Sequence, residues 1–571
     1  MFMEDESRMQ DAKEQNQSEE KKRQKHWKRN LLLFILFLIA AGLGKRYFPS
    51  QRKMDLEHSY YKIGKEEDGA LIVGNSNTEM GVKIEEESLY LPLEAVNTYI
   101  NERFYWDGQC ILYTLPEETA EYIPGSTEFQ VGEWRMSCGY VPVLLENGQV
   151  WLEIRLIEQY TNITWTRQEN PCRIWVWNCW EQELTYAQAK RSLPVRYRGG
   201  VKSPIVTRLK KEETVQVLDD SLKYWTKVQT EEGLIGYVWS RGLKEFYTET
   251  KHHSFEEPEY TSLSLGGKVI LMWHQNLSDS GLEELPDILQ NNKINVIAPS
   301  WFTISDSDGQ IINRAEKAYT DLAHEAGVSV WAMLDNMNVE IDNYELLSST
   351  DNRRRLIDNV MQAALDSGVD GINVDLESIG EACGPSFAQL IRELSAACRK
   401  EKLILSVDNY VPTGSSLYYN RDEQAAVADY IIMMGYDEHW AGSEPGSTAS
   451  YSFVENGILR SLQEVPEEKL ILAVPFYTRL WTIEGDVISS RAVGIKDIPQ
   501  ILREWETNVQ WLEEERQHYA QVSQENIVQK LWIEDADSMT WKLELVKKYN
   551  LAGTAVWKAG MGTEEIWNLN W

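Results

Sequence analysis

Short apolar segments recur along the last part of this chain, and stretches with helical spacing of apolar residues separate them. Eight such segments lie between residues 263 and 571, and each is expected to form a buried strand. They are Lys268–Trp273, Asn295–Trp301, Val328–Leu334, Gly371–Glu377, Leu403–Asn409, Tyr430–Tyr436, Leu470–Phe476 and Gly553–Trp557. Eight strand–helix alternations predict a (β/α)₈ barrel, also called a TIM barrel, over residues 263–571. The alternative is an open doubly wound sheet, which normally carries a glycine-rich phosphate loop that this sequence lacks.

The fourth segment, Asp370–Glu377, has polar residues at alternate positions. Because side chains alternate between the two faces of a strand, Asn373, Asp375 and Glu377 share one face. The apolar residues between them share the other face and can pack beneath helices. Burying a polar triad inside a barrel is costly without partners, and branched apolar residues fill barrel interiors better. The pattern therefore favours a functional site over a strand with one solvated face.

The two carboxylates of this segment have a chemical use. Like charges on one strand face resist simultaneous ionisation, so one group can hold a proton near neutral pH. Chemistry in such barrels gathers at the carboxyl ends of the strands. Glu377 lies furthest toward that end, which makes it the better candidate for a general acid. Asp375 lies deeper and can orient a substrate group.

Asp370–Glu377 resembles the DGxDxDxE signature of glycoside hydrolase family 18, the chitinases and related endo-acting enzymes. Met434–Asp437 resembles the MxYD segment after the sixth strand of that family, and Val474–Arg479 resembles its seventh-strand segment. Trp557 resembles the Trp that floors the sugar site. Lys530–Asp535 and the helix after it resemble the branch that includes bacterial spore-cortex and cell-wall lysins. The matches follow one another in family order along the whole barrel segment.

The resemblance implies an O-glycosyl hydrolase that cleaves an N-acetylhexosamine-containing glycan by substrate-assisted retention. Glu377 would protonate the leaving oxygen and then activate water. Asp375 would hold the acetamido N–H of the sugar, and Tyr436 would hydrogen-bond its carbonyl. The expected substrate contacts are Asn373, Asp370, Met434, Asp437, Trp557, Trp301 and Arg479. Neither a metal nor a cofactor is expected.

One residue departs from the family pattern. Asn373 stands where the signature has its middle Asp. An Asn cannot take a shared proton from Asp375, although its amide can donate a hydrogen bond. The departure bears on rate and pH dependence rather than on the role of Glu377. A catalytically weak lectin and a structural wall-attachment protein are the alternatives, and the retained Glu377 favours the hydrolase. The sequence does not choose between peptidoglycan and a chitin-like glycan, or between endo and exo action.

The N-terminal segment bears on the compartment. A basic stretch, Lys21–Arg29, precedes the apolar run Leu31–Gly44, which predicts a cytoplasmic tail over 1–29 and a membrane anchor over 30–48. As a helix the run would span ~21 Å, short of the ~30 Å hydrocarbon core, so flanking residues would have to cover the mismatch. A cleaved signal peptide is the alternative. Both predict that the remaining chain lies outside the cytoplasm, and the anchor predicts a single-pass protein of the cell membrane.

Two further modules are expected before the barrel. Tyr90–Tyr99 and Trp151–Tyr160 match as an internal repeat, which predicts a duplicated α+β domain over 55–182 with a strand, a short helix and two strands per copy. This segment resembles the stalk-like domain related to the N-terminal module of copper amine oxidases. It has no His cluster, so no copper chemistry is implied, and a spacer or wall-contacting role is expected.

Residues 195–247 contain short strand-like runs between turn residues, which predict a small all-β barrel. Thr230–Leu243 resembles the end of a bacterial Src-homology-3-like (SH3-like) domain, a module that often binds cell-wall peptides or glycans. A polar linker over 248–262 would join it to the large barrel. The net charge of −32 repels nucleic acid at long range, so a glycan polymer is the expected partner and nucleic acid is not.

Overall fold

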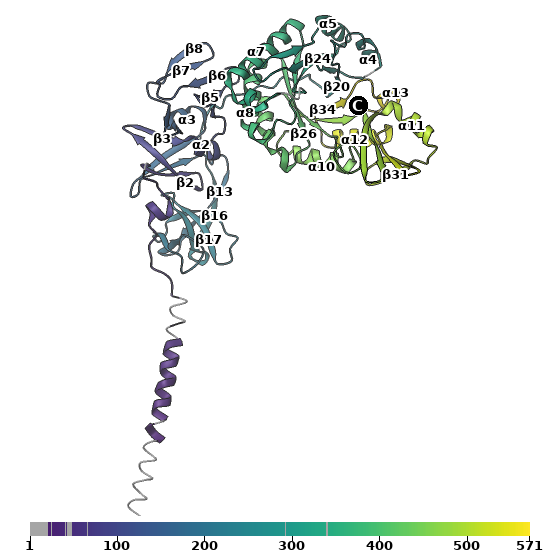
Figure 1. Ribbon diagram of the computed structural model, residues 1–571. Helices are drawn as coiled ribbons and strands as arrows, with labels where there is room; N and C mark the ends of the chain where they lie inside the picture. Colours follow the sequence, from purple (N-terminus) through teal and green to yellow (C-terminus); the bar gives the residue numbers. More distant parts are fainter. Residues whose placement is uncertain are drawn as a thin grey trace, which may run out of the picture. The chain divides into compact units, whose positions relative to one another are not determined.

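The computed structural model describes residues 21–23, 25–39, 42, 48–65, 67–291, 293–337 and 341–571. The chain forms two compact units (Figure 1). The first unit contains the chain up to Asn101 together with Glu146–Glu256. The second contains Glu102–Leu145 and Glu257–Trp571.

The predicted membrane anchor, 30–48, is not supported by the structure. Residues 25–39 are helical and exposed. Within the described parts of the chain, no helix combines the length and the apolar character that crossing a membrane requires. Residues 40, 41 and 43–47 of the predicted anchor lie outside the described residues, as do residues 1–20 of the predicted cytoplasmic tail.

The repeat forms two similar strand–helix units. In the first copy β3 (Ser88–Pro92) leads into α2 (Leu93–Tyr99), and in the second β10 (Gln149–Glu153) leads into α3 (Ile154–Tyr160). The two strands pair with each other in antiparallel orientation. Two strands follow each helix, which confirms the predicted order: β4 (Tyr105–Trp106), β5 (Ile111–Thr114), β11 (Thr164–Gln168) and β12 (Arg173–Trp177). The similarity to copper amine oxidases stays a prediction.

Most of the repeat belongs to one sheet of the first unit, in which the strands follow the order β11-β12-β1-β2-β3-β10. Its remaining strands are β1 (Gly69–Val73) and β2 (Ser76–Glu85). The chain passes from the second unit to the first within β9 (Val143–Glu146). Strands β3, β10 and β12 are buried along most of their length, and their residues Leu91, Leu152 and Ile174 are fully buried. Glu153 ends β10 and its side chain accepts a hydrogen bond from the Arg155 N–H, so it caps the following helix.

The second sheet of the first unit has the order β15-β14-β18-β17-β16-β13-β19. Its strands are β13 (Glu183–Ala189), β14 (Leu193–Arg196), β15 (Ile205–Leu209), β16 (Thr214–Asp219), β17 (Trp225–Thr230), β18 (Ile235–Trp239) and β19 (Leu243–Thr250). Small and branched side chains fill its interior, among them Ala187, Val195, Val215, Val228 and Val238. The sheet begins at Glu183 and ends at Thr250, somewhat beyond the predicted range 195–247.

Eight parallel strands close the barrel of the second unit (Figure 1). They are β20 (Val269–His274), β21 (Val296–Pro299), β24 (Ser329–Asp335), β25 (Gly371–Asp375), β26 (Ile404–Tyr410), β27 (Tyr430–Met434), β28 (Leu470–Pro475) and β34 (Gly553–Trp557). Each pairs with the next in parallel, and β34 pairs with β20 to complete the circle. The predicted (β/α)₈ barrel is confirmed.

Helices surround this barrel. They are α4 (Leu285–Asn291), α5 (Lys317–Glu325), α6 (Asn343–Ser348), α7 (Thr350–Ser367), α8 (Gly384–Glu401), α9 (Arg421–Val427), α10 (Tyr451–Ser461), α12 (Ala536–Lys548) and α13 (Glu564–Trp567). Local signals set the ends of α7: the Ser349 hydroxyl accepts from the Asn352 N–H, and Gly368 ends the helix at φ +70°. An apolar core lies between strands and helices, and a second one with Trp273 and Trp331 fills the barrel interior.

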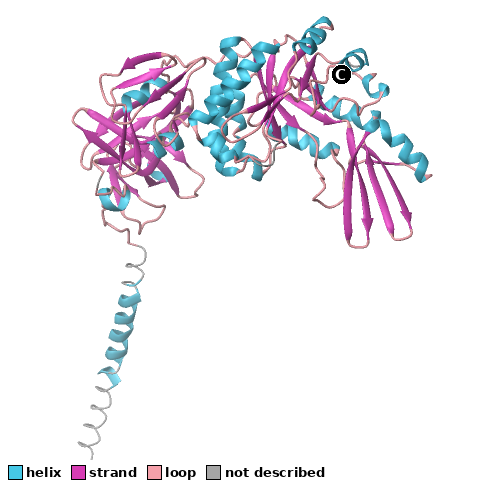
Figure 2. Ribbon diagram, turned by 45° about the horizontal axis from the view of Figure 1, so that its top comes forward, coloured by secondary structure: helices cyan, strands magenta, loops and turns pink. Residues whose placement is uncertain are grey.

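A second sheet interrupts the barrel between β28 and α12. It contains β29 (Tyr477–Glu484), β30 (Val487–Gly494), β31 (Gln510–Leu512), β32 (Gln517–Gln524) and β33 (Ile527–Ile533), with α11 (Ile498–Trp505). The strands are antiparallel in the order β30-β29-β33-β32-β31. Figure 2 shows this sheet as a group of long strands beside the barrel. The sheet and α11 share a small apolar core that includes Leu480, Ile501 and Leu531.

A β-meander from the repeat region also belongs to the second unit. Its strands follow chain order: β4, β5, β6 (Thr119–Tyr122), β7 (Glu128–Val131) and β8 (Trp134–Ser137). It contacts α8, where the Tyr105 hydroxyl lies 2.9 Å from that of Ser386 and the Gln389 amide donates to Thr114 Oγ1 at 3.0 Å. The repeat alone places residues 102–145 in the stalk-like domain, whereas their contacts group them with the barrel.

Candidate active site

The polar triad lies at the carboxyl end of β25. Asn373 and Asp375 are 0% and 3% exposed, while Glu377 stands just beyond the strand and is partly exposed. The residues between them, Ile372, Val374 and Leu376, belong to the core beneath the helices. The period-two alternation therefore turns Asn373 and Asp375 toward the barrel interior, as the sequence predicts.

Neighbouring strands hold Glu377 in place. The Tyr410 hydroxyl, at the end of β26, donates to Glu377 Oε2 at 2.7 Å. The Glu377 N–H donates to Asn336 Oδ1 at 2.9 Å, and the Asn336 amide donates back to the Glu377 carbonyl at 2.8 Å. These three contacts fix both the backbone and the carboxyl group of the candidate acid. Tyr410 and Asn336 are not singled out by the sequence, although both stand where a barrel strand ends.

Asp375 is enclosed and short of partners. Burial raises the pKa of its carboxyl well above the ordinary value, and the charges of Asp408, Glu377 and Asp335 add to the effect. Its Oδ1 accepts no hydrogen bond from any residue that the structure describes. An unpaired buried oxygen is costly, so this atom would gain free energy from a donor on a bound ligand.

Asn373 is fully occupied by three hydrogen bonds. Its Oδ1 accepts from the Trp273 indole at 2.8 Å. Its amide donates to Ser406 Oγ at 3.0 Å and to Asp408 Oδ1 at 2.8 Å. Asp408 is thus a further carboxylate inside the barrel, and burial raises its pKa well above the ordinary value. The sequence carries a signal for it, because Ser406 and Asp408 alternate with apolar residues on the fifth strand.

Tyr436 and its neighbours come from the ends of β27 and β28. The Tyr436 ring lies 6.1 Å from that of Tyr477, and burial raises the pKa of the Tyr436 hydroxyl well above its ordinary value. The Tyr477 hydroxyl donates to Asp437 Oδ1 at 2.7 Å, and Arg479 Nε lies 3.7 Å from the same oxygen. Met434 is buried at the end of β27. Asp437 is exposed, so this cluster reaches the surface.

Trp557 ends the last barrel strand and is partly exposed. Its ring packs against that of Trp273 with 5.7 Å between centroids. Trp273 is buried and donates to Asn373, so Trp557 connects to the triad through one aromatic neighbour.

Two predicted substrate contacts need correction. Asp370 lies at the opposite end of β25 from Glu377, and its Oδ2 accepts from the Val330 N–H and lies 2.8 Å from His324 Nε2. Trp301 is 0% exposed and its indole donates to the Ser280 carbonyl at 3.0 Å. Asp370 is therefore structural, because only the carboxyl end of the strand faces the site. Trp301 has no free ring face for a sugar, because its side chain is fully buried.

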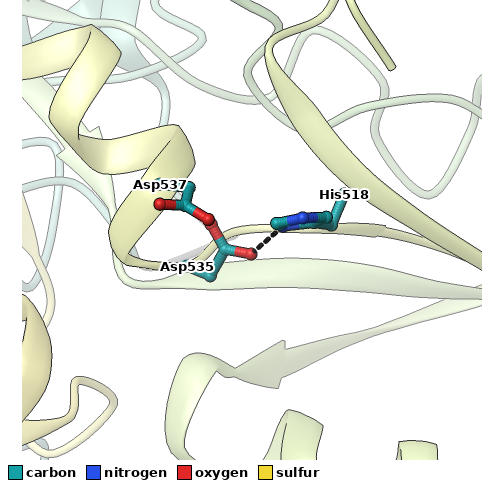
Figure 3. A group of neighbouring side chains, drawn as sticks. All are labelled: His518, Asp535 and Asp537. Carbon is teal, nitrogen blue, oxygen red and sulfur yellow. Dashed lines mark hydrogen bonds and ion pairs between the residues drawn. The ribbon is translucent and has the colours of Figure 1, made fainter. Parts of the chain in front are cut away.

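Of the residues that the structure describes, one group offers the ligand types of a metal site: His518, Asp535 and Asp537 (Figure 3). His518 Nδ1 lies 2.6 Å from Asp535 Oδ2. The other oxygen of Asp535 accepts from the Ser538 N–H and caps α12. The contacts that fix Asp535 are therefore those of a helix cap, and the group lies on β32 and α12 rather than among the triad residues.

Comparison with protein families agrees with this geometry. Residues 269–562 match the model of glycosyl hydrolases family 18, and residues 191–244 match that of the bacterial SH3 domain. The first match covers more than half of the chain. The fold and site thus define an O-glycosyl hydrolase of chitinase-like type. The chain belongs to glycosyl hydrolases family 18 and carries an SH3-like domain before its barrel.

Curated relatives occur in Bacillus subtilis. One of them, named the uncharacterized glycosylase YvbX, is 23% identical over 299 residues, which cover 48% of this chain and 83% of YvbX. The cortical fragment-lytic enzyme is 24% identical over 233 residues, which cover 39% of this chain and 54% of that enzyme. The match therefore spans about half of the cortical enzyme.

Among solved structures, the spore cortex-lytic enzyme SleL of Bacillus megaterium is similar at 17% identity and a TM-score of 0.48, over 56% of this chain and 76% of that one. A chitinase from Chromobacterium violaceum is similar at 18% identity and a TM-score of 0.48, over 53% of this chain and 97% of that one.

Proposed function

We propose that this protein cleaves a β-linked N-acetylhexosamine glycan, either peptidoglycan or a chitin-like polymer, by a substrate-assisted retaining mechanism with Glu377 as the proton donor. The observation that carries the proposal is the pairing of a fixed, partly exposed Glu377 with a buried Asp375 whose Oδ1 lacks a hydrogen-bond donor among the described residues. An unpaired oxygen of this kind suits the acetamido N–H of a bound sugar.

The chemistry follows from these positions. Glu377 protonates the leaving oxygen while the acetamido oxygen of the sugar attacks the anomeric carbon. The Asp375 carboxylate accepts a hydrogen bond from the acetamido N–H and so orients the acetamido group. The Tyr436 hydroxyl donates a hydrogen bond to the carbonyl oxygen of the same group. Glu377 then takes a proton from the water that opens the cyclic intermediate.

Further residues are proposed to contact the sugar. Trp557 offers a partly exposed aromatic face for the pyranose ring. Asp437 and Arg479 offer polar groups beside it, and Met434 and Asn373 support the site from below. The match to glycosyl hydrolases family 18 and the name of one relative, the cortical fragment-lytic enzyme, support peptidoglycan or a chitin-like polymer as the substrate class.

We also propose that the protein acts outside the cytoplasm. The basic stretch followed by an apolar run near the N-terminus supports this location. Protease treatment of intact cells checks it: an external barrel is digested while a cytoplasmic marker survives. Protection of the barrel until the cells are opened would contradict the location.

The central test is the substitution Glu377→Gln, assayed on purified peptidoglycan and on chitin with products identified by mass. Loss of the proton donor should lower kcat by at least about 10²-fold, the usual contribution of general acid catalysis. Glycan binding should persist because the amide keeps the shape of the side chain. Glu381→Gln is the matched control, since Glu381 is an exposed residue of the same loop. If kcat of Glu377→Gln equals that of the parent enzyme, Glu377 is not the proton donor.

A second test addresses the acetamido group. De-N-acetylated polymer should resist cleavage, because it lacks the attacking oxygen and the N–H that Asp375 would hold. Efficient cleavage of that polymer would exclude acetamido assistance while leaving the general acid in place. Binding of both polymers without any cleavage would favour the lectin alternative.

A further inference from the structure

Three aspartates lie side by side on neighbouring barrel strands. Asp335 on β24 pairs in register with Asp375 on β25. Val374 pairs with Val407 on β26, so the next residues along these two strands are Asp375 and Asp408. All three aspartates are buried, at 1%, 3% and 3% exposed respectively. Residues in register on parallel strands point to the same face, so the three carboxyl groups form one layer inside the barrel.

Their hydrogen bonds differ. Asp335 is satisfied at both oxygens, since Oδ1 accepts from the Met337 N–H at 3.1 Å and Oδ2 from the Thr303 hydroxyl at 3.2 Å. Asp408 accepts at Oδ1 from the Asn373 amide. Asp375 Oδ1 has no donor among the described residues. The two neighbours with unused hydrogen-bonding capacity are therefore Asp375 and Asp408.

The other carboxyl groups around this pair can only add negative charge: Asp335 faces it from β24 and Glu377 from the end of β25. The Tyr436 hydroxyl faces it from the end of β27 and is neutral, because burial raises its pKa well above the ordinary value. Among the described residues, no Lys, Arg or His contributes to the pKa shift of either carboxyl group. Two adjacent buried carboxylates without a cation cannot both be ionised at low cost, so the pair retains one proton.

We propose that Asp408 is the proton-sharing partner of Asp375, the role that Asn373 cannot fill. The inference rests on the proposed function. In the free enzyme one proton lies between an oxygen of Asp375 and one of Asp408. When the sugar binds, that proton passes wholly to Asp408. The Asp375 carboxylate then accepts a hydrogen bond from the acetamido N–H. One proton moves within the pair and its net charge stays at −1. The Asn373 amide holds Asp408 Oδ1 as an acceptor and leaves Oδ2 for the proton. Asp408 is thus a positioning residue.

The test compares Asp408→Asn with the relocated variant Asn373→Asp/Asp408→Asn, which returns a carboxyl group to the other neighbour of Asp375. A proton-sharing pair titrates in two steps, whereas a lone Asp375 titrates in one step between them. The infrared absorption of protonated carboxyl groups is measured as a function of pH to give a titration curve. This curve should show one step fewer in Asp408→Asn, and the missing step should return in the relocated variant.

Kinetics give a second readout. In Asp408→Asn the acid limb of the kcat/KM profile should move to higher pH by about one unit, because the new amide donates more weakly than the shared proton. Asp429→Asn is the control: Asp429 is also buried, but it accepts from the N–H groups of Leu263 and Leu405 at the opposite strand ends. The Asp429→Asn substitution should lower the free energy of unfolding. It should leave the acid limb of the kcat/KM profile and the two infrared titration steps of the pair unchanged.

Each outcome decides the inference. Two titration steps and a parental acid limb in Asp408→Asn would overturn it, as would a folded relocated variant that keeps the single step. If the relocated variant does not fold, Asp408→Asn alone still decides by the number of steps. The infrared titration requires no turnover, so it stands if no glycan is cleaved. If Glu377→Gln abolishes cleavage while Asp408→Asn behaves as the parent, the proposed function stands and the pairing fails.

Discussion

At the scale of single residues, the candidate acid depends on groups outside the signature. Tyr410 and Asn336 come from the strands on either side of β25, and together they fix the Glu377 carboxyl and backbone. Positioning of this kind matters because proton transfer needs the donor within hydrogen-bond reach of the leaving oxygen.

Tyr410→Phe removes the hydroxyl that donates to Glu377 at 2.7 Å. A hydrogen bond to a charged group contributes about 1.5–3 kcal/mol, so we expect kcat to fall by about ten- to a hundredfold. KM should change little, since the hydroxyl is engaged with the acid. Steady-state kinetics on a soluble glycan measure the effect, with the exposed Tyr344→Phe as control. An unchanged kcat would show that Glu377 does not need this contact.

His274 predicts a pH dependence of stability. It is buried against the Tyr319 hydroxyl, and burial lowers its pKa below the ordinary 6.5. Below pH 6.5 the unfolded chain takes up a proton at this position that the folded protein refuses, so stability is lost as pH falls toward the folded pKa. In His274→Gln the free energy of unfolding should decline less over this window. Urea unfolding at a series of pH values checks it, and parallel curves for both proteins would contradict it.

At the scale of elements, the β-meander of residues 102–145 joins the barrel helices through buried charges. Arg353 on α7 binds Glu393 on α8 at 2.9 and 3.0 Å, and its guanidinium lies 5.0 Å from the ring of Tyr105. Arg103 from the meander reaches Glu423 at 3.0 Å. Buried pairs of this kind cost desolvation to form, but removing one partner leaves an uncompensated charge.

Glu393→Gln should lower the free energy of unfolding by about 3–5 kcal/mol, because Arg353 is fully buried and would lose its counter-charge. Urea unfolding followed by circular dichroism measures the change. Glu401→Gln, at the exposed end of the same helix, is the matched control and should stay close to the parent. Equal stability of the two variants would mean that solvent reaches the pair.

At the scale of the whole molecule, the barrel is not bounded by the continuous segment 263–571. Its compact unit includes residues 102–145, which precede the SH3-like domain in the chain. The polar contacts of α7 and α8 with the meander include Thr350 with Asp107 and Gln389 with Thr114. A fragment that begins at residue 257 leaves these buried polar groups without partners.

We therefore expect the fragment 257–571 to unfold at a lower temperature than the full chain and to aggregate during size-exclusion chromatography. Co-expression of residues 102–145 should recover part of the loss. The full chain with Glu393→Gln provides an internal comparison, since it breaks the α7–α8 ion pair beneath Tyr105 while the meander stays in place. A fragment as stable as the full chain would show that the meander is dispensable.

The sequence by itself determined the local features of this protein. Strand alternation put Asn373, Asp375 and Glu377 on one face, and the strand–helix rhythm predicted the barrel, because both patterns depend on residues close in the chain. The resemblance to family 18 added Trp557 and Tyr436 as candidates, each through a short motif at the end of a predicted strand.

Only the tertiary structure decided which residues meet. Barrel closure brings Tyr410, Asn336 and Asp408 to the triad, although they lie on other strands, and packing buries Trp301 in the core. The grouping of 102–145 with the barrel has the same origin. Register and packing join residues that are distant in sequence, and local patterns hold no information about that pairing.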